Sequence, residues 1–367
     1  MIKNKTIFIA HNWSDTSVSQ QSKALALELS HSNKVIFMSA KKNGFNGKQI
    51  SANLIIYDWP GSRPTGVRDF IFAVKLFKKF KPDIAITNFA ANNIMLLVSW
   101  LVGTNVRMCY HHTLVEQILT DINKVALSTK QRFFIARKAL IYKLATHMLP
   151  CSSAAKEDLI KYYKVSHAKA FVFPNALQDR NLKNIGANSK TIGFIGRLDY
   201  SKGVDILIAA FQQIVSHYPD VKLVIVGTGK QRKALEMQAL QYSGNSIFTG
   251  GVSYDNVFKY LQTFTCLVVP SRTDNLPTVI LEAFSCGTPV IASNAGGIPD
   301  IIEDGENGLL FNDENPIELA NKMTLLLTNK EEGSRLAENA RQTFLEKFCI
   351  DTLPLRFEQL LTTTHYL

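Results

Sequence analysis

Two cations stand close together in the second half of the chain, directly after an apolar segment. The stretch GFIGRLDYSKG (residues 193–203) is typical of a strand and a glycine turn at Gly196, followed by Arg197 and by Lys202 at the start of an amphipathic helix. Arginine offers a planar fork of donors and lysine a compact charge, and both suit a diphosphate. Cations in an arbitrary loop are usually solvated. Here their place at the carboxyl end of a strand favours an anion site.

A second group of polar residues surrounds the start of another predicted helix, PTVILEAFSC (residues 277–286). Pro277 suits the first helical position because its φ is fixed, and the free N–H groups of that turn attract anions. Asp274 lies just before the helix. Glu282 lies inside it among apolar residues, where a carboxylate needs partners such as ligand hydroxyls. The alternative, that Glu282 reaches solvent from an ordinary amphipathic helix, stays open at this level.

Weaker signals lie at two other predicted strand ends. Gly227 and Gly229 follow a strand in IVGTGKQRKAL (residues 225–235), where glycines permit close approach of the backbone to a nucleotide. Many turns contain two glycines for geometry alone, and the full G-x-G-x-x-G spacing is missing. His111 and His112 follow a strand in the first half, and either a structural or a functional role fits them.

Short apolar runs alternate with amphipathic segments along the whole chain, a pattern typical of βα units on parallel sheets. A polar stretch without periodicity, residues 178–190, predicts an interdomain linker. We therefore expect an α/β protein of two facing Rossmann-like, doubly wound domains, residues 1–180 and 181–349, with a ligand in the cleft between them. A final helix at about 350–367 is expected to pack back on the first domain. The predicted strands are residues 6–10, 34–39, 54–58, 83–87, 106–110, 147–151, 170–174, 191–196, 221–227, 246–250, 265–270 and 288–293.

Composition excludes several protein classes. Of 367 residues, 46% are hydrophobic and 19% charged, which excludes a disordered chain. The five cysteines stand far apart without a C-x-x-C pair, so neither a zinc knuckle nor a disulfide framework is encoded. The longest apolar run is too short for a membrane span and the amino-terminal one too short for a signal peptide. We expect a cytoplasmic protein.

Charge divides unevenly between the halves. Residues 1–180 contain 25 Lys or Arg and 10 Asp or Glu, a net charge of +15, whereas residues 181–367 contain 16 and 20, a net charge of −4. The segments 68–82 and 130–143 have helical spacing with aromatic and basic residues, which suits an anionic membrane surface. Ordinary covering helices show the same pattern. A nucleic-acid partner is the other polyanion to weigh, but no nucleic-acid-binding motif accompanies the charge. We expect peripheral attachment to the inner face of the plasma membrane.

The motifs GRLDYSKG, VIVGTGK, FTGGV and SRTDNLPTVILEAFSCGTPVIAS, in this order across residues 191–311, closely resemble the retaining nucleotide-sugar glycosyltransferases of family 4. The resemblance implies the GT-B fold and transfer of a sugar from UDP or GDP to a glycan or a polyprenyl-pyrophosphate-linked acceptor, in the making of surface polysaccharide such as lipopolysaccharide or capsule. The specific motifs lie in the second half of the chain, which the resemblance assigns to the donor, whereas the first half matches only in general pattern. A GT-B nucleotide-sugar epimerase is the alternative.

Carried over by position, the resemblance implies that Arg197 and Lys202 bind the donor diphosphate and that Glu282 holds the ribose hydroxyls. Asp274 stands where the family usually has a Glu against the sugar ring, so altered sugar contacts are expected. His112 is the preferred histidine near the reacting centre. The remaining donor-binding set is Gly196, Gly227, Gly229, Thr249, Gly250, Val252, Asn275, Leu276, Pro277 and Thr278.

Two further features bear on the chemistry. The family's early Gly-Gly loop is replaced by HNWSDTSVSQQ, so Ser14–Ser19 are expected to take over its contacts. No Asp-x-Asp pair is present, and we expect no metal or other cofactor, with Arg197, Lys202 and the helix start neutralising the pyrophosphate. The resemblance implies a front-side transfer in which the leaving phosphate accepts the acceptor's proton.

Overall fold

The protein is described by a computed structural model that covers residues 2–15, 17–40, 44–122, 126–187, 189–242 and 244–363. It divides into two compact units. The first unit comprises Met1–Thr113, Leu127–Gln178 and Ile350–Leu367, and the second comprises Leu114–Ala126 and Asp179–Cys349. The segment Leu114–Ala126, which the sequence places in the first domain, thus groups with the second unit.

A seven-stranded sheet in the order β3-β4-β2-β1-β5-β6-β7 forms the centre of the first unit. All neighbouring strands are parallel except β3 and β4. Its strands are β1 (Thr6–His11), β2 (Lys34–Ser39), β3 (Asn46–Ser51), β4 (Leu54–Asp58), β5 (Ile84–Thr87), β6 (Val106–His111) and β7 (His147–Pro150). Its helices are α1 (Ser17–Leu29), α2 (Val67–Phe80), α3 (Asn92–Leu101), α5 (Thr129–Tyr142), α6 (Ser153–Tyr163) and α13 (Leu353–Thr363).

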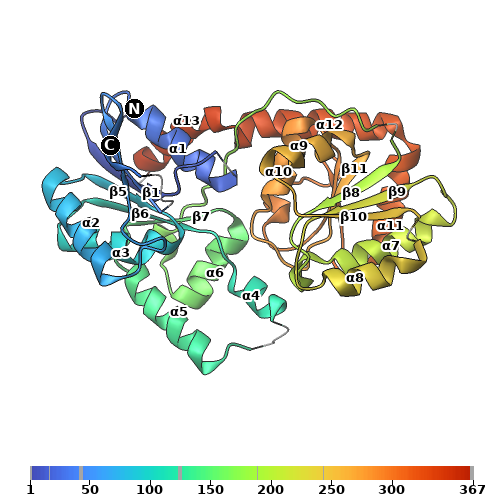
Figure 1. The fold of residues 1–367 in the computed structure, drawn as a ribbon, viewed down its shortest axis with the longest axis horizontal. Coiled ribbons are helices and arrows are strands. Elements are labelled where there is room, and N and C mark those ends of the chain that lie inside the picture. The colour runs from blue at the N-terminus through green and yellow to red at the C-terminus, as the bar shows by residue number, and fades with distance from the viewer. Residues whose placement is uncertain are drawn as a thin grey trace. The chain divides into compact units, whose positions relative to one another are not determined.

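The sheet of the first unit is covered on both faces (Figure 1). One core cluster joins Leu25 of α1 and Phe357 of α13 to the strands. The other joins Phe77 of α2 and Met95 of α3 to the opposite side chains of the same strands. Strands buried on both faces explain the nearly continuous apolar runs in the sequence.

The second unit contains a six-stranded, wholly parallel sheet in the order β10-β9-β8-β11-β12-β13. Its strands are β8 (Thr191–Ile195), β9 (Lys222–Val226), β10 (Ser246–Gly250), β11 (Cys266–Val269), β12 (Val290–Ser293) and β13 (Leu309–Phe311). Its helices are α4 (Val115–Asp121), α7 (Val204–Val215), α8 (Arg232–Ala239), α9 (Tyr254–Thr263), α10 (Thr278–Cys286), α11 (Pro316–Thr328) and α12 (Lys330–Thr343). Both units are Rossmann-like, as predicted.

Three strand predictions differ from the structure. Residues 170–174 do not form a strand: Phe171 and Phe173 donate to β7, but only the Met148–Ala170 pair is a bridge. Pro150 has no N–H, so the reciprocal ladder cannot continue there. The sequence analysis missed β3, an exposed polar edge strand without apolar alternation, and β13, which has three residues.

The two basic aromatic segments behave differently. Helix α2 buries Ala73, Leu76 and Phe77 in the core and is an ordinary covering helix. Helix α5 buries only Tyr142 among its described side chains. Phe133 and Leu140 of α5 remain 65% and 64% exposed. None of the helices within the described ranges combines the length and apolar character that a membrane span requires.

Candidate functional site

Loops at the carboxyl ends of neighbouring strands gather in the second unit. Gly227, after β9, donates a hydrogen bond to the Gly250 carbonyl at the end of β10 (2.8 Å). Leu198, after β8, donates to Thr228 (2.9 Å). Because parallel strands end at one edge, this bonding brings the predicted donor residues of β8, β9 and β10 together.

Two glycines make this close approach possible. A Cβ on Gly227, whose φ is +143°, would lie 1.8 Å from the Gly196 carbonyl oxygen. A Cβ on Gly229 would lie 2.4 Å from the Leu198 oxygen. The glycines therefore allow the backbones of the two loops to pack directly against each other. This packing fixes the position of the backbone on both sides of Arg197.

Arg197 lies in a polar hollow of about 520 Å³ within the second unit. Its guanidinium is exposed and donates to Asp199 (2.6 Å), while the Asp121 carboxylate of α4 lies 3.8 Å away. The other Asp121 oxygen accepts from the Ser201 backbone N–H (3.2 Å). Lys230 also lines the hollow. Two cations are thus available to an anion, with two carboxylates already beside them.

Lys202 and Asp274 bind each other. The Lys202 ammonium lies 2.5 Å from Asp274 Oδ2, and both side chains are largely buried. The second Asp274 oxygen accepts from the Asn275 N–H (3.0 Å). The close approach of Gly296, where a Cβ would lie 1.9 Å from the Asp274 carbonyl oxygen, fixes this loop from the other side. The sequence analysis proposed both residues for the site but did not predict their pairing.

Helix α10 begins one residue later than predicted. Pro277 has ψ 109° and is the N-cap, so Thr278 is the first helical residue. The extended backbone of Pro277 ends the Asp274 loop just before the helix. Asn275 and Leu276 of this loop are buried. The first turn of α10 therefore lies at the end of the Asp274 loop.

Glu282 is a buried carboxyl group in α10. Burial raises its pKa to about 7, against hydrogen bonds from Tyr254 and Thr278 and the positive charge of Arg180. Arg180 itself packs over the Phe258 ring at 4.3 Å. The alternative that Glu282 reaches solvent is therefore wrong. The group is held at a pKa where a ligand hydroxyl can shift its ionisation.

Thr249 and Val252 flank the end of β10. The Thr249 hydroxyl donates to the Gly250 carbonyl (3.0 Å), and Val252 is half-buried. Thr249 is the penultimate residue of β10 and Val252 lies two residues after the strand, so both are close in sequence to Gly250, which Gly227 contacts. All the predicted donor residues belong to the second unit.

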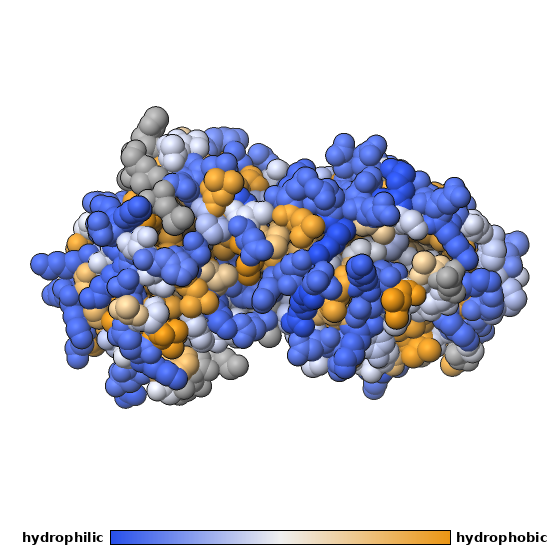
Figure 2. Space-filling view, turned by 90° about the horizontal axis from the view of Figure 1, so that it is seen from above, coloured by the Kyte–Doolittle hydropathy of each residue, from blue (hydrophilic) through white to orange (hydrophobic). Residues whose placement is uncertain are grey.

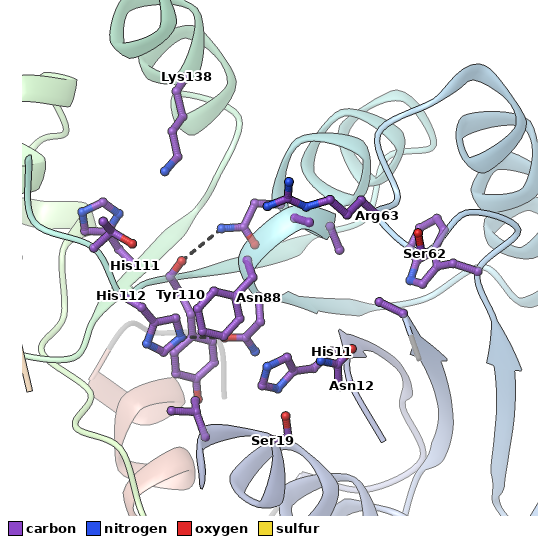
Figure 3. Close-up of a pocket in the computed structure, with 18 of the residues that line it drawn as sticks. His11, Asn12, Ser19, Ser62, Arg63, Asn88, Tyr110, His111, His112 and Lys138 are labelled. Atoms are coloured by element: carbon purple, nitrogen blue, oxygen red, sulfur yellow. Dashed lines mark hydrogen bonds between the residues drawn. The ribbon is translucent and has the colours of Figure 1, made fainter. Parts of the chain in front are cut away.

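His112 belongs to the first unit and lines a cavity of about 680 Å³ there (Figure 3). Its Nε2 lies 2.9 Å from Asn88 Oδ1 and, because that oxygen only accepts, carries the proton. The ring stacks on Phe89 at 4.5 Å. Burial lowers the pKa of His112 to about 3, helped by the neighbouring His11 and His111. The imidazole is therefore neutral at physiological pH, with Nδ1 as its acceptor atom.

His111 has a structural environment. Its Nε2 lies 3.1 Å from the buried Asp158 carboxylate, and its Nδ1 lies 3.4 Å from the Tyr142 hydroxyl oxygen. Of the segment Ser14–Ser19, Val18 and Ser19 line the same cavity. Thr16 lies outside the described residues. Phe89 has φ +50°, a strained conformation for an aromatic residue, at the wall of this cavity.

Four residues beside the candidate site were not predicted from the sequence: Asp121, Asp199 and Lys230 around Arg197, and Tyr254 near Glu282. Asp199 could have been found from its place between Arg197 and Lys202. Asp121 and Tyr254 come from distant parts of the chain, and spacing gives no signal for them. Across the part of the chain that the structure describes, no three or more His, Cys, Asp or Glu side chains are grouped closely enough to hold a metal ion.

Two Rossmann-like units with parallel sheets are the architecture of the GT-B class of glycosyltransferases. The family model Glycosyltransferase Family 4 matches residues 19–179, and Glycosyl transferases group 1 matches residues 175–343. The chain belongs to the family 4 glycosyltransferases, and the resemblance seen in its motifs is confirmed.

Similar proteins agree with this assignment. An uncharacterized glycosyltransferase of Methanocaldococcus jannaschii is 35% identical over 181 residues, 49% of this chain and 50% of its own length. Another from the same organism is 25% identical over 84% of this chain and 88% of its own length. The chain thus spans about half the length of the first of these relatives. The structure of Anabaena HepE in complex with UDP is similar in fold, with a TM-score of 0.76 at 18% identity over 98% of this chain and 100% of that one.

Proposed function

We propose that the protein is a retaining glycosyltransferase that moves a sugar from a nucleotide diphosphate, UDP in the first instance, to a glycan or lipid-linked acceptor of a surface polysaccharide. The carrying observation is a loop cluster in the second unit: Arg197 and Lys202 follow β8, while Asp274 and the helix α10, which contains Glu282, follow the neighbouring strand β11, and Lys202 contacts Asp274 directly. UDP is favoured because the Anabaena protein of the same fold was solved with UDP bound.

The proposed mechanism assigns the leaving group to this cluster. The Arg197 guanidinium and the Lys202 ammonium stabilise the negative charge that develops on the departing diphosphate. Glu282 accepts hydrogen bonds from ribose hydroxyls. When the diphosphate binds, it competes with Asp274 for Lys202 and with Asp199 for Arg197, so the donor exchanges partners with existing ion pairs. In this proposal no divalent cation takes part.

The test is direct. UDP and GDP are titrated against the full chain by calorimetry and thermal shift, since a ligand at 100 times its Kd adds about 2.7 kcal/mol of stability. Arg197→Ala, Lys202→Ala and Glu282→Ala are each expected to weaken binding at least tenfold and abolish donor turnover. Turnover that persists with EDTA supports the metal-free proposal. Normal binding in all three variants refutes the site.

Product analysis separates transfer from epimerisation. A transferase needs an acceptor and gives a glycoside with the donor's anomeric configuration. An epimerase changes the nucleotide sugar without an acceptor.

The attachment to a membrane surface is part of the proposal. Helix α5 exposes the neighbouring rings of Phe133 and Phe134, with Leu140 one to two turns further on. Lys130 and Arg132 are exposed on the same helix. Figure 2, seen from above the view of Figure 1, shows hydrophobic residues scattered among hydrophilic ones on that face, away from α5, which lies at the bottom of Figure 1. Exposed aromatic side chains among cations suit an anionic lipid interface.

Vesicle sedimentation tests this part. The protein is expected to sediment with vesicles that contain phosphatidylglycerol and to stay in the supernatant when the vesicles are pure phosphatidylcholine. Phe133→Ser with Phe134→Ser should abolish sedimentation, whereas Val67→Ser, an exposed position on α2, should not. Equal binding by the double variant and wild type would contradict α5 as the contact.

A further inference from the structure

The cavity of the first unit is lined by cations without a matching carboxylate. Lys138 of α5 and Arg63, which precedes α2, line it. The other polar lining residues that the structure describes are neutral amides, hydroxyls and aromatic N–H or imidazole groups, and none of these described lining residues is Asp or Glu. Figure 3 shows both cationic groups extending toward the residues that surround the cavity. This charge pattern favours an anion inside.

The imidazoles do not add to that positive charge. Burial lowers the pKa of His11 to about 4, and burial with neighbouring positive groups lowers that of His112 to about 3. Both rings are neutral at pH 7. The positive charge of the cavity therefore comes from Lys138 and Arg63.

Lys138 has no direct ion pair among the described residues. Within the described ranges its ammonium forms no hydrogen bond or salt bridge, and it lies over the rings of Tyr142 (5.1 Å) and Tyr163 (5.3 Å). The Asp158 carboxylate favours the charged ammonium only from a distance, and its Oδ2 lies within hydrogen-bond reach of His111. Desolvation outweighs this attraction and lowers the Lys138 pKa. A half-buried ammonium whose direct contacts are aromatic faces is costly to the protein alone, and an incoming anion offsets that cost.

The geometry points to an acceptor that carries a negatively charged group, a phosphate or a carboxylate, bound by Lys138 and Arg63, which both line the cavity. The inference rests on the proposed function, because it takes this cavity as the acceptor site. The neutral His112, with its proton on Nε2 and Nδ1 as acceptor, lies in the same cavity and suits a hydrogen bond from the acceptor hydroxyl. The charged group thus selects the acceptor, and the hydroxyl is the group that reacts.

The experiment uses the full chain saturated with UDP, or with GDP if only that binds, so that the donor site is filled. Inorganic pyrophosphate and glucuronate are the two anionic probes and glucose is the neutral probe, each titrated by calorimetry. We expect at least one anion to bind and to bind at least tenfold more tightly than glucose. Pyrophosphate alone indicates a phosphorylated or lipid-pyrophosphate acceptor, and glucuronate alone an acidic sugar.

Lys138→Met and Lys138→Gln are the test variants, and Lys130→Met, exposed on the same helix, is the matched control. Both Lys138 variants should lose at least tenfold in anion affinity while keeping UDP affinity, and the thermal midpoint of the unliganded protein should not fall, because a desolvated ammonium is removed. Lys130→Met should bind like wild type. No binding of either anion to UDP-saturated protein, or unchanged anion affinity in the Lys138 variants, would overturn the inference. Absence of any nucleotide binding would instead reject the proposed function.

Discussion

The Lys202 ammonium lies 2.5 Å from the Asp274 carboxylate in the loop cluster of the second unit. Each of these groups neutralises the other in the absence of donor. In the proposed mechanism a diphosphate competes with Asp274 for Lys202, and a sugar hydroxyl is the natural new partner of that carboxylate. The proposed function therefore predicts that the pair couples binding of the diphosphate to binding of the sugar.

Removal of one member of this pair is expected to destabilise the protein. Lys202→Met leaves the buried Asp274 carboxylate without its cation, at a cost of about 3 to 5 kcal/mol. Lys202→Met combined with Asp274→Asn should recover part of that loss. Lys190→Met, which breaks the exposed pair with Asp220, should leave stability unchanged. Chemical denaturation measures all three, and equal losses in the single and double variants would contradict the coupling.

Glu282 should make stability depend on pH in a defined window. Its folded-state pKa of about 7 lies above its ordinary value of 4.5, so the folded chain holds the proton more tightly than the unfolded chain. The stabilisation is complete below about pH 4.5 and is lost as the pH rises to about 7, by up to about 3 kcal/mol. Glu282→Gln mimics the protonated form, and its advantage over wild type should grow with pH. A constant difference from pH 5 to 8 would argue against the raised pKa.

Asp121 is expected to oppose donor binding. Its carboxylate lies 3.8 Å from Arg197, and a diphosphate at Arg197 would meet this negative charge. Asp121→Asn should therefore raise UDP affinity, by about fivefold for about 1 kcal/mol of repulsion at this partly exposed position. Glu116→Gln on the same helix is the control. Weaker UDP binding by Asp121→Asn would show instead that Asp121 positions Arg197.

Gly227 should not tolerate a side chain. Gly227→Ala places a Cβ 1.8 Å from the Gly196 carbonyl oxygen at φ +143°, and the backbone strain alone costs about 1 to 3 kcal/mol. Gly333→Ala, in α12 with no heavy atom within 4 Å of the added Cβ, should instead stabilise by about 0.5 to 1 kcal/mol. Thermal unfolding compares the two. UDP binding should fall in Gly227→Ala alone.

Sequence reasoning found the βα alternation because buried parallel strands are apolar on both faces. It proposed Arg197, Lys202 and Glu282 as site residues because they follow strand ends or lie in an apolar helix, and their roles in donor binding stay predictions. It placed Pro277 one residue too far into the helix, since a fixed φ suits both the N-cap and the first helical position. Asp121, which lies beside Arg197, could not be predicted, because its place depends on which unit the segment after β6 joins. The pairing of Lys202 with Asp274 likewise depends on loop geometry that spacing does not encode.

The chain crosses between the two units more than once. It leaves the first unit after Thr113, returns at Leu127, leaves again after Gln178 and returns at Ile350. Leu353 and Phe357 of α13 fill the core of the first unit beside residues near the amino terminus. During synthesis on the ribosome, the amino-terminal unit cannot complete its interior until α13 has emerged. The second unit, whose long segment Asp179–Cys349 emerges before α13, is therefore expected to reach its native packing first, so the order of folding runs opposite to the order of translation.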